Sequence, residues 1–103
     1  MIVARFLVEA RFGHKQKVIE MMRSWDQQFG TKVGWTSDKT RTLTGSIGAP
    51  ESLIINEIRL ESLSELDTSF QKLATLDGHA EWGREIEPYI VSGSNRWEIL
   101  REI

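Results

Sequence analysis

The stretch DGHAEWGREIEPYI, residues 77–90, contains one of the two histidines of the chain and, three residues after it, a tryptophan. This spacing places His79 and Trp82 on one face of a helix. An imidazole there can move a proton near neutral pH, and an indole can hold a flat apolar compound. The same side chains could instead pack against a sheet, cap the helix, or hydrogen-bond to Asp77 or Glu81. The pattern therefore helps to locate a pocket without naming a reaction.

A second polar candidate lies in the apolar stretch SLIINEIRL, residues 52–60. Asn56 is the only polar member of the alternating set that also contains Ile54 and Ile58, and this set forms the more apolar face of a strand. Its amide could hold a substrate oxygen. It could also satisfy a backbone group at a strand irregularity, because buried amides are nearly always hydrogen-bonded. We predict Asn56 and His79 as the catalytic residues.

Aromatic side chains elsewhere in the chain could enclose these two groups. The predicted substrate-binding residues are Trp25, Trp35, Trp82 and Tyr89. With an amide and an imidazole, they would bind and polarise a planar, oxygenated aromatic molecule. A tryptophan on an amphipathic helix is also a common core residue, so packing is the alternative role of Trp82.

Metal and cofactor chemistry has little support in the sequence. The chain has no cysteine, which removes thiolate zinc sites, iron–sulfur clusters and a cysteine nucleophile. The two histidines, His14 and His79, belong to different segments and form no His-x-x-x-His pair. The turn GSIGAP lacks the lysine and the following helix of a phosphate-binding loop. We predict no metal site and no cofactor.

Composition limits the partners. Of the 103 residues, 40% are hydrophobic and 27% are charged, so we expect a single folded domain over residues 1–103. The net charge is −2 without a run of like charge, so neither nucleic acid nor a membrane surface is an expected partner. Charged residues interrupt the apolar N-terminal stretch, which argues against a signal peptide and a membrane span and favours a cytoplasmic location.

The residue pattern of the N-terminal half predicts a strand, a helix and then two further strands. Residues 2–12 alternate as a strand does, and the apolar residues that follow recur at helical spacing until Gly30, which we expect to close the helix in a left-handed conformation. The β-branched stretch 31–45 predicts a long second strand. A turn rich in glycine follows, and residues 52–60 predict the third strand.

The C-terminal half predicts a broken helical region and a last strand. Ser62 and Glu65 form a capping box, in which serine oxygen and glutamate carboxylate bind each other's backbone N–H. Asp77 is expected to cap a second, short helix. Pro88 is expected to end that helix by forcing Glu87 towards extended geometry. Residues 96–103 alternate again as a strand.

The element order β-α-β-β-α(α)-β favours one fold. Right-handed crossovers and a central hairpin predict an α+β, ferredoxin-like, four-stranded antiparallel sheet with the helices on one face. The other face mixes charged residues (Arg5, Glu9, Glu57, Arg59 and Glu98) with apolar ones (Val3, Leu7, Leu53, Ile55 and Leu100). A second copy of the chain would cover it and pair opposite charges across a two-fold axis. The charges could alternatively form a solvated network or line a channel.

The element order, the broken second helix and the closing run HAEWGREIEPYIVSGSNRWEILREI resemble the dimeric α+β barrel superfamily, and within it the small NIPSNAP-like proteins. The resemblance implies a homodimer whose sheets close into a barrel, with a ligand cavity between helices and sheet in the enzymatic members. Those members include cofactor-independent quinol monooxygenases, haem-degrading monooxygenases, lactone isomerases and polyketide cyclases. Ala4, Phe6 and Val8 stand in the first-strand positions where haem-degrading relatives carry an asparagine, which argues against haem degradation here.

Two functions follow as hypotheses. The first is a cofactor-independent enzyme, of monooxygenase or isomerase type, that acts on a small oxygenated aromatic or apolar compound through His79 and Asn56. It requires a cavity of at least a few hundred Å³. The second is a non-catalytic homodimer that binds a small molecule or a protein. In that case we expect His79 and Asn56 to be bonded to backbone groups and no cavity of that size.

Overall fold

The computed structural model describes residues 1–103, and it contains one four-stranded antiparallel sheet in the order β2-β3-β1-β4. The strands are β1 (Ile2–Glu9), β2 (Thr40–Thr44), β3 (Leu53–Leu60) and β4 (Arg96–Arg101). The α-helices are α1 (Lys15–Trp25), α2 (Leu63–Leu73) and α3 (His79–Ile86). A π-turn, η1 (Asp26–Gly30), and two 3-10 turns, η2 (Thr31–Val33) and η3 (Glu87–Tyr89), complete the chain.

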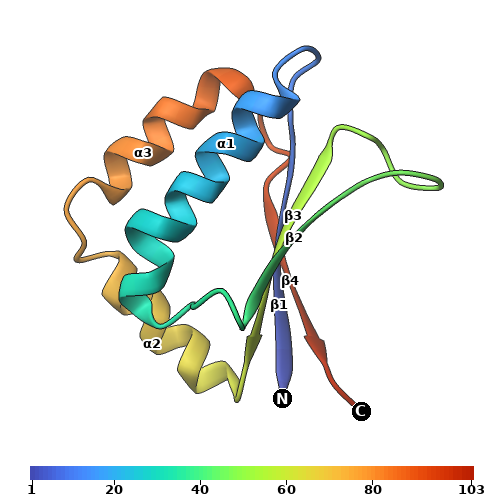
Figure 1. Cartoon of the computed structure of the whole chain (residues 1–103). Helices are drawn as coiled ribbons and strands as arrows, with labels where there is room; N and C mark the ends of the chain where they lie inside the picture. Colours follow the sequence, from blue (N-terminus) through green and yellow to red (C-terminus); the bar gives the residue numbers. More distant parts are fainter.

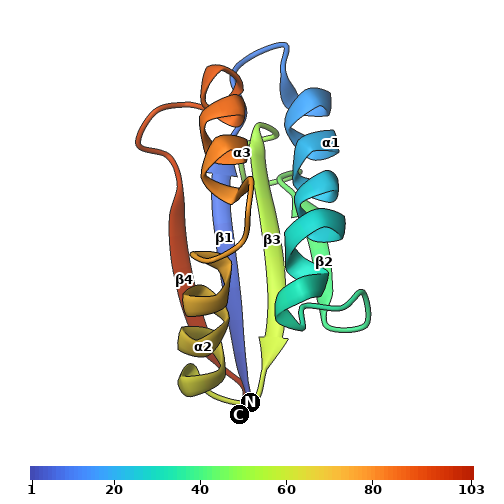
Figure 2. The same ribbon diagram turned by 90° about the vertical axis from the view of Figure 1, so that its left-hand side faces the viewer.

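All helices lie on one face of the sheet (Figure 1). Figure 2, viewed from the helical side, shows α1 alongside β3 and β2, whereas α2 and α3 follow one another over β4 and β1. Both termini lie at the same end of the sheet. This arrangement confirms the predicted α+β, ferredoxin-like fold with a split second helical region.

The core beneath the helices consists of two separate clusters. One cluster packs α2 and η2 against the sheet through Ala4, Phe29, Val33, Trp35, Ile58, Leu60, Leu66 and Leu73. The other packs α1 and α3 against it through Val8, Ala10, Val18, Met22, Ile54 and Ile86. Asn56 lies on β3 between Ile54 and Ile58, one member of each cluster. The amide therefore marks the place where the core divides.

The end of α1 differs from the prediction. Gly30 has an ordinary helical φ of −57°, and the chain continues through η1 and η2 until Gly34, whose φ of 87° ends the turns. Position 30 favours glycine for a steric reason rather than a conformational one, because a Cβ there would lie 3.2 Å from the Trp25 ring. The second strand consequently starts at Thr40 rather than at residue 31, so the predicted strand over 31–45 was wrong in its first part.

The first strand is also shorter than predicted. β1 ends at Glu9, with one further bridge from Ala10 to Ile90. Phe12 lies beyond it in the loop before α1, where its side chain is fully exposed. Apolar alternation therefore extends past the last residue that pairs with a neighbouring strand.

The predicted helix caps are partly wrong. Ser62 Oγ accepts a hydrogen bond from the Glu65 N–H (3.3 Å) as predicted, but the Glu65 carboxylate accepts from the Glu61 N–H (2.7 Å) rather than from Ser62. Asp77 does not cap α3, because Gly78 takes the cap position with a φ of 86°. A glycine can adopt this left-handed geometry without the strain of a Cβ.

Pro88 does not end α3 by forcing Glu87 into extended geometry, as was predicted. Glu87 keeps helical dihedral angles, and Pro88 lies inside the 3-10 turn η3 that directly follows α3. Proline is tolerated in the first turn of a helical segment, where its missing N–H would have no partner. The α-helix therefore changes to a 3-10 turn after Ile86, before the chain leaves the helical layer.

The open face of the sheet holds a buried ion-pair network. Glu57 is only 4% exposed, and its carboxylate accepts hydrogen bonds from Arg5 Nε (2.8 Å) on β1 and Arg41 Nε (2.6 Å) on β2. Burial alone would raise the pKa of Glu57, but the hydrogen bonds from Arg41 and Arg5 outweigh it and lower the pKa below 4.5. The charges of Arg5, Arg41 and Glu57 thus pair within one chain.

None of the helices is long and apolar enough to cross a bilayer.

Candidate functional site

The floor of the candidate site is a row of side chains across the sheet. Strand register places Asn56 on β3 opposite Phe6 on β1, and Phe6 opposite Trp97 on β4. Directly opposed residues in antiparallel strands project from the same face. The rings of Phe6 and Trp97 lie 5.4 Å apart, so the row carries one amide and two aromatic rings toward the helices.

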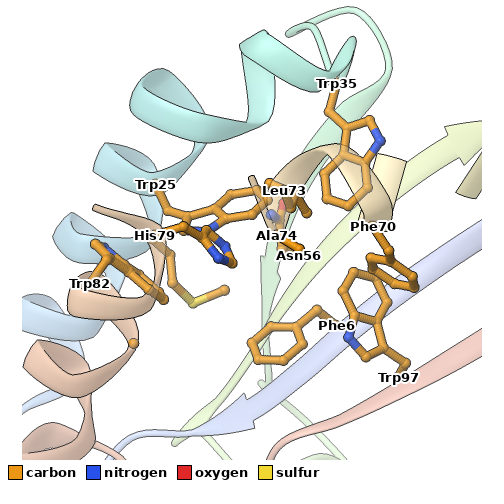
Figure 3. Close-up of a pocket in the computed structure, with 12 residues that line it drawn as sticks. Phe6, Trp25, Trp35, Asn56, Phe70, Leu73, Ala74, His79, Trp82 and Trp97 are labelled. Atoms are coloured by element: carbon orange, nitrogen blue, oxygen red, sulfur yellow. The ribbon is translucent and has the colours of Figure 1, made fainter. Parts of the chain in front are cut away.

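The helical layer opens above this row. α2 ends at Leu73 and α3 begins at His79, and the residues that flank this break, Ala74 and His79, both line a cavity of about 430 Å³. The full lining is Phe6, Met22, Trp25, Trp35, Asn56, Phe70, Leu73, Ala74, His79, Trp82, Gly83 and Trp97. Nine of these twelve residues are hydrophobic, so the cavity suits a largely apolar ligand. Figure 3 shows the labelled side chains around it.

Three tryptophans from the helical side form the aromatic walls. The ring of Trp25 lies 5.5 Å from that of Trp35 and 6.4 Å from that of Trp82. Hydrogen bonds hold the two outer indoles, since Trp35 Nε1 donates to Ser69 Oγ (3.1 Å) and Trp82 Nε1 donates to the Met21 carbonyl (3.3 Å). The predicted aromatic residues Trp25, Trp35 and Trp82 therefore come together. Trp82 also packs against both core clusters.

Phe70 and Trp97 lie where the cavity meets solvent. Their rings contact each other at 5.1 Å, and they are 37% and 39% exposed, respectively. Phe70 comes from α2 and Trp97 from the edge strand β4, so this part of the cavity lining lies at the surface between these two elements.

His79 lies in an aromatic setting. Its ring makes an edge contact with Phe29 at 5.2 Å and another with Trp25 at 5.9 Å. None of the hydrogen bonds in the structure involves the imidazole, which differs from the cap or carboxylate contact considered as its alternative role. Desolvation by burial lowers the pKa of His79 below 6.5. The ring is therefore neutral at pH 7 and can accept a proton.

Asn56 has one bonded end and one free end. Its Nδ2 donates to Asp26 Oδ1 (3.0 Å), whereas its buried Oδ1 has no partner. An unpaired buried acceptor costs about 1–3 kcal/mol relative to a bonded one. No backbone group satisfies this amide, in contrast to its alternative structural role. The free oxygen belongs to a residue that lines the cavity.

Asp26 is a residue that the sequence reasoning missed. Burial raises the pKa of the Asp26 carboxyl, and the hydrogen bond from Asn56 only partly opposes this shift. A signal existed, because Asp26 follows Met22 by four residues and so falls on the apolar stripe of the first helix. Phe6, Phe70 and Trp97 were also missed as lining residues. They come from three different elements: the strand register brings Phe6 and Trp97 together, and the packing of α2 adds Phe70.

Tyr89 lies apart from the cavity. Its ring packs against His14 at 5.5 Å, and Lys17 Nζ lies 5.7 Å from the ring centre. The predicted substrate-binding set is therefore brought together except for Tyr89. No group of three or more histidine and acidic side chains is arranged to hold a metal ion.

Comparison with known proteins bears on the fold. Neither protein-family models nor curated protein sequences match the chain. A NIPSNAP family protein of known structure from Agrobacterium tumefaciens superimposes with a TM-score of 0.80 at 20% identity, over 99% of this chain and 92% of that one. An uncharacterized NIPSNAP-like domain protein from Burkholderia xenovorans gives 0.70 at 16% identity, over 99% and 84%.

A third structure belongs to a protein from Nitrosomonas europaea that is named as a candidate antibiotic biosynthesis monooxygenase. It superimposes with a TM-score of 0.67 at 7% identity, over 100% of this chain and 99% of that one. These similarities confirm the predicted resemblance to NIPSNAP-like proteins as a resemblance of fold. Because fold does not fix chemistry, the reaction has to be argued from the site.

Proposed function

We propose that the cavity binds a small, flat, oxygenated aromatic compound, and that the protein acts on it as a cofactor-independent enzyme of monooxygenase or isomerase type. One observation carries this proposal. A cavity of about 430 Å³ with mostly hydrophobic walls contains an amide and an imidazole, and neither group is bonded to the backbone. This combination meets the requirement of the enzyme hypothesis rather than that of the non-catalytic one.

His79 is the proposed proton acceptor. The neutral imidazole takes the proton of a ligand hydroxyl or of an acidic carbon, and the electron pair stays on the ligand. Asn56 orients the ligand at the floor of the cavity. Such proton removal is a common first step for isomerisation and for attack on oxygen without a cofactor. General-base catalysis of this kind typically contributes about 10²–10⁴-fold in rate.

Binding is tested first with 1-naphthol, by isothermal titration calorimetry. Gly83 lines the cavity, and open space surrounds the position of a Cβ there. We expect Gly83→Phe to fill part of the cavity and to weaken binding at least tenfold. Gly83→Ala is the matched control, which should keep the affinity and gain up to ~1 kcal/mol of helix stability. Equal affinity in the Gly83→Phe variant would place naphthol elsewhere.

Turnover is tested with 1,4-dihydroxynaphthalene by following oxygen uptake and the ligand absorbance. We expect His79→Gln to reduce the rate by about 10²-fold, because glutamine has the size of a histidine but is not a base. The wild-type rate should fall with decreasing pH as His79 is protonated, at a pH below 6.5. Binding without any turnover would favour the non-catalytic hypothesis.

The open sheet face supports a proposal of its own. Leu100 is 43% exposed on this face and lies opposite Val3 in the register, and the paired charges around Glu57 lie on the same face. We propose that a second copy of the chain covers it, as in the barrel that the sequence resemblance implies. Sedimentation equilibrium at micromolar concentration should give twice the chain mass of 11.8 kDa. A single 11.8 kDa species would refute the homodimer but not the cavity.

A further inference from the structure

The Asp26 carboxylate determines which end of the Asn56 amide is free. Asp26 is the first residue of η1, and its Oδ1 lies 3.0 Å from Asn56 Nδ2 across the gap between helical layer and sheet. An ionised carboxylate only accepts hydrogen bonds, whereas an amide has a donor end and an acceptor end. The NH₂ end therefore faces Asp26. The carbonyl end is left as the acceptor.

The unusual backbone places this carboxylate. Asp26 follows Trp25, the central ring of the aromatic wall, at the point where α1 widens into a π-turn. π-turns within helices occur frequently at functional sites. The same turn brings Gly30 close to the Trp25 ring, where a Cβ would lie 3.2 Å from a ring carbon and force a small displacement. The wall and the carboxylate are thus fixed by one local feature.

The free carbonyl has no structural partner. Asn56 is 5% exposed, its Oδ1 is buried, and its strand neighbours in the row, Phe6 and Thr42, make no hydrogen bond to it. A purely structural amide would be bonded at both ends. Asn56 lines the cavity, but its Oδ1 has almost no accessible surface there, so a ligand donor reaches it only when the surrounding side chains move slightly.

We propose that Asp26 is a positioning residue that makes the cavity selective for ligands with a hydrogen-bond donor, such as a phenolic or enolic hydroxyl or an N–H group. The same skeleton with only acceptors, such as a methyl ether, would face the Asn56 carbonyl without a hydrogen bond. This inference rests on the proposed function, since it assigns the ligand class of the same cavity. It also excludes a negative charge on the ligand atom that faces Asn56, because the carbonyl and the Asp26 carboxylate both repel it. The proton that His79 takes in the proposed reaction therefore comes from another atom of the ligand.

The experiment compares 1-naphthol with 1-methoxynaphthalene by calorimetry at neutral pH. We expect the wild-type protein to bind 1-naphthol roughly tenfold more tightly, the ratio that corresponds to about 1.4 kcal/mol. In Asp26→Asn, the new amide can donate or accept, so Asn56 can turn either end to the ligand. The ratio should then fall to about two, with the methyl ether bound as well as before or better.

Each outcome has a separate meaning. If neither compound binds the wild-type protein, the proposed function fails. If both compounds bind equally to the wild-type protein, the cavity proposal stands and the donor selectivity is wrong. If Asp26→Asn keeps the tenfold ratio, Asp26 does not position the amide. Thermal unfolding checks that Asp26→Asn folds, and Asp26→Ser, which also removes the carboxylate, is measured in the same way and judged by the same ratio.

Discussion

Two neighbouring residues of β3, Asn56 and Glu57, are buried to a similar degree on opposite faces of the sheet but differ in how fully they are hydrogen-bonded. Glu57 is 4% exposed and receives hydrogen bonds from two arginines. Asn56 is 5% exposed and has a free carbonyl oxygen. The charged residue, which is the more costly to bury, is fully paired, and the neutral residue is not. The buried charge on the open face is paired within the chain, whereas the helical face leaves one buried acceptor unpaired beside a cavity.

Removal of the arginines should give the largest effect. With Arg5→Met and Arg41→Met together, Glu57 stays buried without a partner, and we expect a loss of about 3 kcal/mol in the free energy of unfolding at pH 7. Urea denaturation measures it. Arg59→Met is the control, because Arg59 and Glu102 form an exposed pair whose loss should cost less than ~1 kcal/mol.

The pH dependence of the arginine variant has a defined sign. In the wild-type protein the pKa of Glu57 is lowered in the fold, so its stabilisation is present above pH 4.5 and is lost as the pH falls through the folded-state pKa. Without the arginines, burial alone raises this pKa, so the variant loses stability as the pH rises above 4.5. The difference between the two proteins should shrink in acid. A difference that stays constant with pH would mean that Glu57 is not its source.

Asn56→Leu, unlike the arginine variant, should affect ligand binding more than stability. Leucine removes the unpaired carbonyl, which favours folding, but it also removes the hydrogen bond to the Asp26 carboxylate, which opposes folding, so we expect the free energy of unfolding to change by no more than about 1 kcal/mol in either direction. Binding of 1-naphthol should nevertheless weaken at least tenfold. Such a trade of function for stability is common at sites with strained or unsatisfied groups. A loss of more than ~3 kcal/mol would show that Asn56 is a structural residue like Glu57.

His79 should give the smallest effect on stability. Burial lowers its pKa below 6.5 in the folded chain, so between that lower pKa and 6.5 the unfolded chain binds more protons. The free energy of unfolding should therefore decrease as the pH falls through this window, by less than ~1 kcal/mol because the ring is only partly buried. Urea denaturation at several pH values measures this slope. His79→Gln should lack this part of the dependence, and an unchanged slope would contradict the assigned shift.

The sequence predicted the parts of the site that depend on one element at a time. Alternation in β3 located Asn56, and helical spacing located His79 and Trp82. Asp26 was missed although the same reasoning, a polar residue on an apolar stripe, applies to it. Trp97 could not be found in this way, because its place beside Phe6 depends on the register of β4 against β1. The predicted start of the second strand was wrong because the helical segment does not stop at Gly30 but continues through η1 and η2 to Gly34.

The central claim is that the free carbonyl of Asn56 serves a ligand in the aromatic cavity. A crystal structure of the protein with 1-naphthol tests it most directly. We expect the naphthalene ring to lie among Trp25, Trp35 and Trp82, with its hydroxyl oxygen within hydrogen-bonding distance of Asn56 Oδ1. A cavity that stays empty at saturating naphthol, or an Asn56 carbonyl that is bonded to the protein itself, would contradict it.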